Sequence, residues 1–287
     1  MNTVLLNNTF VDKKNNEIPK KLERMLRRAD NFTRLCVNAT QKILTPDINK
    51  LIKDISPEDI AIILATRFGP IETNFRYLDT IFDFGEQQGS PTLFSHSVHN
   101  TASGYISRIF NFQGPIYNIS SYTYPLFSAL FCALKLMEQD LAKIVLIIEA
   151  ETKSILLDDG INRILKYNCQ TNILQTYSYA IAWLLTNQNY ITNNICITDF
   201  KLEERCNNLA LSTILTKNVT ITINEYIEKT ILYNTTTKFT KCIEKMINNS
   251  DNCYIRFDIK SEIGYIYGKI YKNNINNNKE VSNETVS

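Results

Sequence analysis

Two histidines and a run of hydroxyl side chains are the residues of this 287-residue chain whose types could do chemistry. His96 and His99 are the only histidines, and the run Ser120-Ser121-Tyr122-Thr123 follows downstream. A hydroxyl group activated by an imidazole base can accept an acyl group. Ser121 and Thr123 are therefore candidate acyl acceptors in an acyltransferase or hydrolase. However, no Gly-x-Ser-x-Gly motif surrounds them, and no flanking glycine would relieve the strain of a nucleophile turn.

A metal site would need more ligands than the two histidines supply. The seven cysteines, at positions 36, 132, 169, 196, 206, 242 and 253, have no CxxC spacing, and none lies near a histidine in sequence. Zinc sites in proteins usually have four ligands at characteristic spacings. The sequence therefore predicts no metal site and no other cofactor.

The composition is typical of a soluble protein from a reducing compartment. An odd number of cysteines without a secretion signal indicates the cytoplasm. The formal net charge of +2 gives no electrostatic case for nucleic-acid binding. No apolar run approaches the roughly 20 residues that a membrane span requires. We therefore expect a cytoplasmic protein with no nucleic-acid partner and no membrane span.

The elements that must position these residues follow from hydrophobic periodicity. The expected strands are residues 3–6 with 9–11, 59–66, 116–120, 143–149, 176–186 and 194–201. The expected helices are 18–44 (one helix or a pair, with a basic outer face), 47–54, one after Gly69-Pro70, one from Asn100 to about Phe112, and 125–140. Residues 85–90 and those around His96 are expected to form loops. Because apolar runs such as 59–66 and 143–149 are typical of strands buried on both faces, we expect an α/β fold with a central mixed sheet.

The pattern weakens in the C-terminal third of the chain. It favours a helix at 205–216, a strand at 218–224, a helix at 235–248, and strands at 252–259 and 263–271. The Asn-rich residues 272–287 lack core side chains, so we expect a disordered tail.

A longer motif surrounds the two histidines. From Ser90 the chain reads Ser-Pro-Thr-Leu-Phe-Ser-His-Ser-Val-His-Asn, and Gly114-Pro115 follows. This order resembles the N-terminal half of β-ketoacyl synthases, and most closely the short ketosynthase-like proteins described as chain length factors in aryl polyene and dialkylresorcinol pathways. The matching residues are Ser90, Pro91, Thr92, Phe94, Ser95, Ser97, Val98, His99, Asn100, Ala102 and Gly104. The resemblance is specific over residues 60–150.

The resemblance implies a thiolase-like layered fold whose second half is abbreviated. We expect residues 1–271 to form one thiolase-like domain. Its ketosynthase-like N-terminal part would cover about 1–200, and a reduced C-terminal part would cover 201–271.

The resemblance also implies that ketosynthase chemistry is lost. In ketosynthases a cysteine eight residues after Gly-Pro accepts the acyl chain, and here that position is Thr123. A threonine hydroxyl without a neighbouring base cannot replace a thiolate. Ketosynthases further use two histidines in their C-terminal half, whereas no histidine follows His99. The chain therefore resembles a non-catalytic subunit.

Such a subunit, by the same resemblance, pairs with an active β-ketoacyl-ACP synthase as a heterodimer or larger complex, and works with an acyl carrier protein. It would shape the tunnel for the growing acyl or polyene chain. The contact would involve the helix from Asn100 and the strand at 116–120. The candidate tunnel or interface residues are Asn100, Tyr105, Phe112, Tyr117, Tyr122, Tyr124 and Phe127.

His99 and Asn100 could also be read as a catalytic pair. We expect instead that Asn100 caps the helix it begins and that His99 makes local hydrogen bonds. A homodimeric scaffold with no polyketide role is a further alternative.

Overall fold

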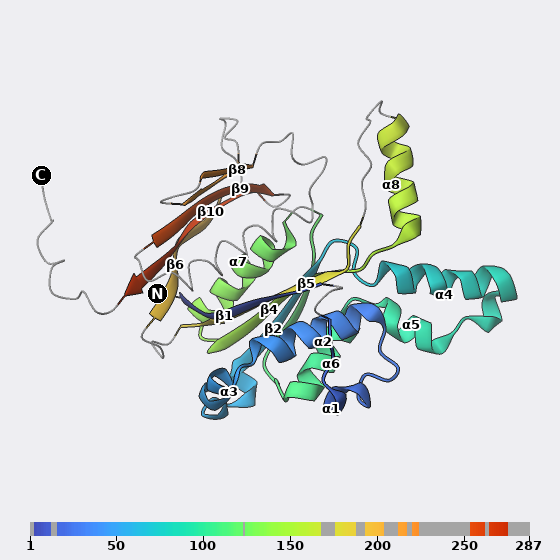
Figure 1. The fold of residues 1–287 in the computed structure, drawn as a ribbon, viewed down its shortest axis with the longest axis horizontal. Helices are drawn as coiled ribbons and strands as arrows, with labels where there is room; N and C mark the ends of the chain where they lie inside the picture. The colour runs from blue at the N-terminus through green and yellow to red at the C-terminus, as the bar shows by residue number, and fades with distance from the viewer. Residues whose placement is uncertain are drawn as a thin grey trace, which may run out of the picture.

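The computed structural model describes residues 3–12, 16–122, 124–167, 176–187, 193–203, 212–216, 220–223, 253–261 and 264–274. Its strands form a ten-stranded sheet in the order β3-β2-β4-β5-β1-β6-β10-β9-β7-β8 (Figure 1). Their bounds are β1 Thr3–Asp12, β2 Ile60–Thr66, β3 Ile116–Ser120, β4 Ile144–Glu151, β5 Tyr179–Thr186, β6 Asn193–Glu203, β7 Ser212–Thr216, β8 Thr220–Ile223, β9 Cys253–Ser261 and β10 Gly264–Asn274.

The sheet is parallel where the candidate site lies and antiparallel elsewhere. Strand β2 pairs in parallel with β3 on one side and with β4 on the other. The pairs β4–β5, β5–β1, β1–β6 and β6–β10 are antiparallel. The carboxyl ends of β2, β3 and β4 therefore meet at one edge of the sheet, where α/β proteins commonly place their chemistry.

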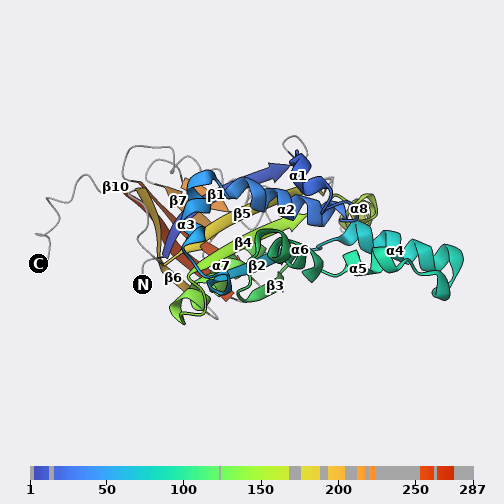
Figure 2. The same ribbon diagram turned by 90° about the horizontal axis from the view of Figure 1, so that it is seen from below.

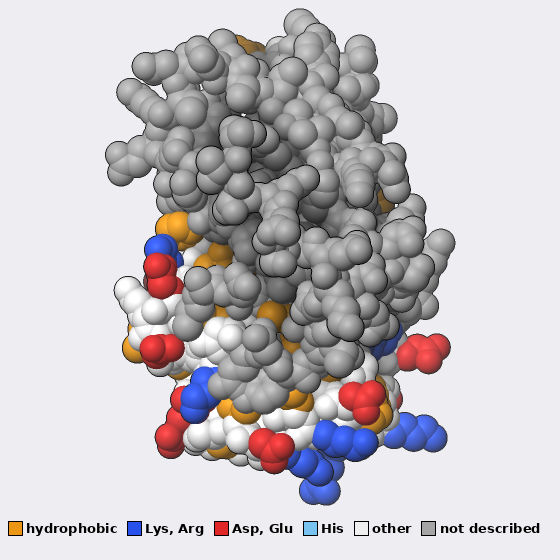
Figure 3. All heavy atoms as spheres, turned by 90° about the vertical axis from the view of Figure 1, so that its left-hand side faces the viewer, with side chains coloured by type: hydrophobic (Ala, Val, Ile, Leu, Met, Phe, Trp, Pro, Cys, Tyr) orange, Lys and Arg blue, Asp and Glu red, His pale blue; other side chains and the backbone are white. Residues whose placement is uncertain are grey.

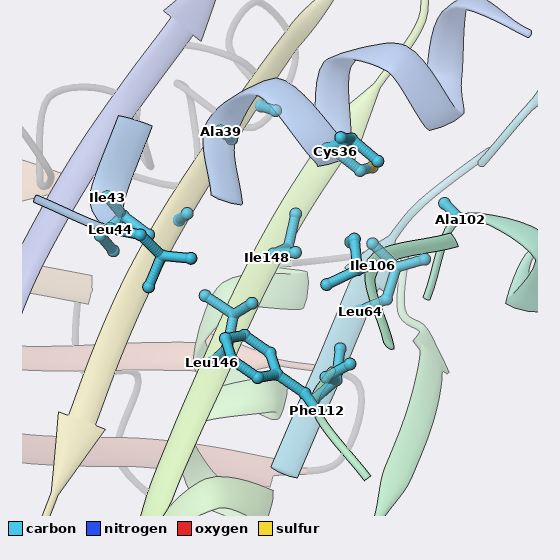
Figure 4. Packing of buried hydrophobic residues seen from close by; sticks show 14 of the residues in the cluster. Cys36, Ala39, Ile43, Leu44, Leu64, Ala102, Ile106, Phe112, Leu146 and Ile148 are labelled. Carbon is cyan, nitrogen blue, oxygen red and sulfur yellow. The ribbon is translucent and has the colours of Figure 1, made fainter. Parts of the chain in front are cut away.

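Helices lie on both faces of this sheet, with the bounds α1 Lys20–Glu23, α2 Asn31–Ile43, α3 Pro46–Lys53, α4 Ile71–Phe84, α5 Pro91–Ser97, α6 Asn100–Phe110, α7 Pro125–Glu138 and α8 Ile155–Tyr167. Helices α2 and α6 cover one face, where Cys36, Ile106 and Leu146 belong to one buried cluster (Figure 4). Helix α7 covers the other face and packs against β2, β4 and β6 (Figure 1).

Strand periodicity explains how one sheet has two cores. In β4, Val145 and Ile147 belong to the cluster around α7, whereas Leu146 and Ile148 belong to the cluster around α2 and α6. Successive side chains on a strand point to opposite faces. All residues of β2, β4 and β5 are buried. The central strands are therefore apolar over most of their length, and the polar residues Thr66, Glu149, Glu151 and Thr186 lie near their ends.

Charges of both signs lie on the face shown in Figure 3. Lys and Arg side chains lie among Asp and Glu side chains on the described part of that face, in keeping with the net charge of +2. Within the described ranges, no helix has the length and apolar character needed to cross a bilayer.

Most sequence predictions for residues 1–200 are confirmed. The strands at 59–66, 116–120, 143–149 and 176–186 correspond to β2, β3, β4 and β5. The helical segment 18–44 is the pair α1 and α2, and the segments 47–54 and 125–140 are α3 and α7. The expected α/β fold with a central mixed sheet and flanking helices is likewise confirmed.

Several predictions need correction. His96 lies on α5 rather than in a loop, and helix α8 was not predicted. The helix expected at 205–216 conflicts with strand β7 at Ser212–Thr216. Strand β10 continues to Asn274, so the first residues of the expected tail are strand. The helix expected at 235–248 and tail residues 275–287 lie outside the described residues.

Candidate functional site at the start of helix α7

The site is centred on the turn that leads from β3 into α7. Tyr124 precedes the helix with φ 52° and ψ 56°, in the left-handed region. Such a backbone is uncommon for a bulky residue and is found where the surrounding structure imposes it, often at functional sites. Pro125 follows as the first helical residue, where its missing N–H costs nothing. Thr123, which the sequence places at the nucleophile position, lies outside the described residues.

The amides of the first turn of α7 all have partners within the chain. Leu126 N donates to Glu149 Oε2 at 3.1 Å. The amides of Phe127 and Ser128 donate to the carbonyl oxygen of Tyr124 at 3.0 and 3.4 Å. A helix N-terminus binds an anion or a thiolate through free amides. This helix start therefore offers no free amide to a substrate oxyanion or a nucleophile.

Glu149 is held by more than the helix amide. Its side chain is 0% exposed, near the end of β4. Tyr179 Oη donates to Glu149 Oε1 at 2.6 Å, so both carboxyl oxygens accept a hydrogen bond. Burial, and then the neighbouring Glu149, raise the pKa of Tyr179 well above its usual value. The phenol therefore stays protonated and serves as a donor.

A second buried acid, Glu151, holds the end of β2. Its Oε1 accepts hydrogen bonds from Arg67 N and from Thr66 Oγ1, the latter at 3.0 Å, and its Oε2 accepts from Phe68 N at 3.2 Å. Arg67 Nε donates to Tyr122 O at 3.0 Å, and Nη1 donates to Tyr179 Oη at 3.4 Å.

These contacts make one network. Burial alone would lower the pKa of Arg67, but Tyr179, Glu149 and Glu151 raise it overall. The guanidinium is therefore a partly buried cation that two buried acids, Glu149 and Glu151, stabilise electrostatically. Its Nη2 is buried without a hydrogen-bond partner among the described residues.

Stability should depend on pH through Glu151. Burial raises the pKa of Glu151 to about 7, Arg67 opposes this shift, and Glu149 adds to it. Between the ordinary glutamate pKa of 4.5 and about 7 the folded protein holds a proton that the unfolded chain releases. The free energy of unfolding should therefore fall as pH rises through this window, by about 3 kcal/mol, and this contribution should be constant above it.

Urea unfolding of the wild type and of Glu151→Gln at pH 5, 6, 7 and 8 measures this dependence. The variant should lose most of the slope, whereas Glu138→Gln, a change of an exposed acid on α7, should keep it. An identical slope in the wild type and Glu151→Gln would refute the assignment.

The structure brings His99 to Ser120 rather than to Ser121. His99 Nδ1 lies 3.1 Å from Ser120 Oγ. Burial lowers the pKa of His99, although a hydrogen bond with the backbone of Phe68 partly opposes this. Ser121 is buried, and its hydroxyl accepts a hydrogen bond from Ser128 Oγ at 3.5 Å. His99 thus hydrogen-bonds within the chain, but its partner Ser120 lies at the end of β3 rather than in its own segment.

The expected cap at Asn100 is wrong. The cap position of α6 is His99, no side chain caps the helix, and Asn100 is its first residue, exposed. His99, the residue before Asn100 in the motif, still packs closely against another segment of the chain. A Cβ on Gly69, whose φ is 60°, would lie 2.3 Å from His99 Cδ2, so the imidazole packs directly on this glycine.

The remaining candidate residues divide by exposure. Phe112, Tyr124 and Phe127 are buried in the two cores, and Tyr105 is partly buried against His96 with 5.8 Å between ring centroids. Tyr117 and Tyr122 are exposed. Strand β3 is the edge of the described sheet, and its apolar Ile116 is exposed as well. Aromatic side chains are therefore available on this edge for contact with another molecule.

Sequence reasoning missed Glu149, Glu151, Arg67 and Tyr179. A signal was present, since two acids stand at the end of the run Ile-Val-Leu-Ile-Ile-Glu-Ala-Glu. A carboxyl group at the end of a strand buried on both faces must find partners. Among the described residues, no group of three or more His, Cys, Asp or Glu is placed to hold a metal ion.

Comparison with known proteins covers most of the chain. The sequence model described as "Beta-ketoacyl synthase, N-terminal domain" matches residues 7–240. No curated protein matches the sequence.

Several solved structures share the fold, and they confirm the expected thiolase-like layered fold. A chain of the ketosynthase ApeO in complex with its chain length factor ApeC, from Xenorhabdus doucetiae, matches with TM-score 0.57 and 14% identity, over 94% of this chain and 99% of that one. The AntDE:AntF structure, a type II polyketide acyl-carrier protein in complex with its ketosynthase bound to the hexaketide, matches with TM-score 0.65 and 12% identity, over 94% and 99%. The ishigamide ketosynthase/chain length factor matches with TM-score 0.54 and 13% identity, over 70% and 68%.

Proposed function

Given that the chain belongs to the β-ketoacyl synthase family through its N-terminal domain, we propose that it is a non-catalytic subunit of the chain length factor type. It pairs with an active β-ketoacyl-ACP synthase, which carries out the condensation. This chain stabilises that subunit and shapes the tunnel for the growing acyl or polyene chain. The complex would be cytoplasmic and would need no metal or other cofactor of its own.

The observation that carries the proposal is the closed start of α7. Ketosynthase chemistry needs a thiolate at a helix N-terminus. Here the Leu126 amide is bound to Glu149, and the sequence supplies Thr123 in place of cysteine. The absence of histidine after His99 also leaves no imidazole for malonyl decarboxylation. Three losses of different kinds support a subunit without condensing chemistry.

The edge strand β3 supports the pairing. Ile116 and Tyr117 are exposed on it, and Tyr122 is exposed just beyond its end. An exposed apolar edge strand is prone to pair with another chain unless it is covered. We place the ketosynthase contact along this edge and along α6, with Tyr117 and Tyr122 facing the partner's tunnel.

We place the docking of an acyl carrier protein on the basic face of residues 20–28. The side chains of Lys20 and Lys21 on α1 and of Arg24, Arg27 and Arg28 just after it are exposed there, with one exposed acid, Glu23, among them. A surface with an excess of one sign of charge attracts a partner surface of the opposite sign and speeds its association. The face therefore suits a carrier protein with an acidic surface.

Co-expression with the ketosynthase encoded beside this chain tests the pairing. Size-exclusion chromatography and native mass spectrometry should give a one-to-one complex, or a multiple of it, containing the 33.1-kDa chain. A stable homodimer that ignores the ketosynthase would contradict the proposal and favour the scaffold alternative.

The second candidate, an acyltransferase or hydrolase, rests on the contact between His99 Nδ1 and Ser120 Oγ at 3.1 Å. A lowered pKa leaves His99 neutral and able to act as a base. The proposed acceptors Ser121 and Thr123 lack this support, because Ser121 is bound to Ser128 and Thr123 lies outside the described residues. The Discussion gives the experiment that separates the two functions.

A further inference from the structure

A cavity of about 390 Å³ lies at the amino end of β2, between α3, the short 3-10 turn Pro57–Asp59 and the end of α6. Both ribbon views place α3 far from α4, the helix that follows the carboxyl end of β2 (Figures 1 and 2). The cavity is therefore separate from the buried network at the carboxyl ends of β2 and β4. Its volume is within the range that is usual for small-molecule sites.

Backbone hydrogen bonds hold the walls of this cavity in place. Gln113 N donates to Pro57 O at 2.8 Å, and Gly114 N donates to Ile60 O at 3.1 Å. A Cβ at Gly114 would lie 2.5 Å from Ile60 O, so only glycine allows this close approach. A ligand would therefore meet a preformed site, and its binding would not have to order the chain.

The inner surface of the cavity is apolar. Leu44, Ile55, Ile60 and Phe112 line it, are each at most 7% exposed, and belong to the core cluster around α2 and α6. Phe110 extends this surface, with its ring centroid 6.0 Å from that of Phe112. Phe112, one of the candidate tunnel or interface residues, thus lines this cavity. Such a surface favours the apolar part of a ligand.

The mouth of the cavity is polar and carries one positive charge. Asn49, Lys53 and Asn111 line the cavity and are exposed. No Asp or Glu is among the described residues that line it, so Lys53 is the single charged side chain there. None of the ion pairs between described residues involves Lys53. Its ammonium group is therefore available to an anionic ligand.

An amide group adds a second donor at the mouth. Asn111 Oδ1 accepts a hydrogen bond from Gln113 Nε2 at 2.7 Å, and this bond does not use the Nδ2 group of Asn111. Asn111 ends α6 with φ 57°, and its N–H donates to Ser107 O, so its position is fixed by the helix end. An ammonium group and an amide N–H together suit a carboxylate, whose two oxygens both accept hydrogen bonds.

We propose that this cavity binds a monocarboxylate with an apolar chain, with the chain in the hollow and the carboxylate at Lys53 and Asn111. The one cation of the mouth matches the one negative charge of such a ligand. The inference goes beyond the proposed function and does not depend on it. No described residue of the buried network or of the exposed β3 edge lines the cavity.

Calorimetric titration of the full chain with decanoate tests the charge at the mouth. Lys53→Met keeps the apolar stem of the lysine and removes its charge, so the Kd should rise about fivefold, as expected for an exposed ion pair. Lys50→Met is the matched control, because Lys50 is an exposed lysine of the same helix that does not line the cavity. It should leave the Kd within about twofold of the wild-type value.

Ile52→Trp tests the hollow itself. Ile52 lines the cavity and is only partly buried, so a larger side chain there can fill the hollow without displacing the core. Decanoate binding should weaken about tenfold or more, because the apolar chain loses its place. Circular dichroism should report the same fold for all three variants, and Lys53→Met, a surface change, decides the matter if Ile52→Trp does not fold.

Two further ligands separate the chain from its charge. Decanol has the chain without the carboxylate, and it should bind about fivefold more weakly than decanoate. Acetate has the carboxylate without the chain, and it should give no measurable heat. A decanoate with a photoreactive diazirine on its chain should label peptides that contain residues 44–60 or 110–112, the segments that line the cavity.

Several outcomes would overturn the site. These are no binding of decanoate, equal binding of decanol, a Kd that neither Lys53→Met nor Ile52→Trp changes, and labelling confined to other segments. Formation of the complex with the ketosynthase is measured separately, so either proposal can fail while the other stands.

Discussion

Replacing Glu149 by alanine should lower the free energy of unfolding by about 3–5 kcal/mol, one of the largest losses a single substitution in this chain can cause. The substitution leaves Tyr179 Oη and Leu126 N without their acceptor in the core. Arg67 also loses one of the two acids that stabilise its buried charge. The cavity left by the missing carboxyl group adds to the loss.

Glu149→Gln separates the effect of the lost hydrogen bonds from the effect of the lost side-chain volume. Glutamine has the shape of glutamate and keeps one acceptor oxygen, so the loss should be about half as large. Glu138→Ala, which removes an exposed acid paired with Lys135 on α7, should change the urea midpoint little. If Glu149→Ala behaves like Glu138→Ala, then Glu149 does not hold the start of α7.

On the proposed function, the same network links the stability of the chain to its loss of chemistry. A free helix N-terminus stabilises negative charge on a nucleophile or an intermediate. In this chain the carboxyl group of Glu149 takes that place permanently. The Leu126 amide is therefore bound within the core and is not free for a nucleophile or an intermediate.

The central strands could be predicted because their signal is local. The runs at β2 and β4 are apolar except for Thr66, Glu149 and Glu151 near their ends, as burial on both faces requires. Pro125 marked the start of α7 correctly. The left-handed turn at Tyr124 carried no signal, because tyrosine is not a residue that favours this backbone.

Other features were missed for identifiable reasons. Ser90 and Pro91 are an N-cap and a first-turn proline for α5, yet the motif was interpreted as a loop. The network joins residues at or near β2, β4, β5 and α7, which are far apart in the sequence. No local sequence pattern predicts contacts between such distant residues. The helix predicted at 205–216 failed because a short apolar run fits a strand equally well.

Removing this chain from the condensing system should lower product formation at least tenfold, whereas removing its hydroxyl candidates should not. The active subunit would lose the partner that covers its interface, and so become insoluble or slow. Ser120→Ala, Ser121→Ala and Thr123→Ala each delete one possible acyl acceptor. If the chain has no catalytic step, the complex reconstituted with any of these variants should keep its rate within about twofold.

Reconstitution with acyl carrier protein and malonyl units, followed by mass spectrometry of carrier-bound products, measures both effects. The ketosynthase alone making the same products at the same rate would refute the proposed function. A loss of a hundredfold or more in one hydroxyl variant that still forms the complex would point to an acyl acceptor, and intact-mass detection of an acyl group on the wild-type chain would identify it. Ser120→Ala is the most informative of these variants, because the Ser120 hydroxyl lies 3.1 Å from His99 Nδ1 and the residue is exposed. Full activity of Ser120→Ala would show that this contact is a structural hydrogen bond, and the chain would then act through its surfaces alone.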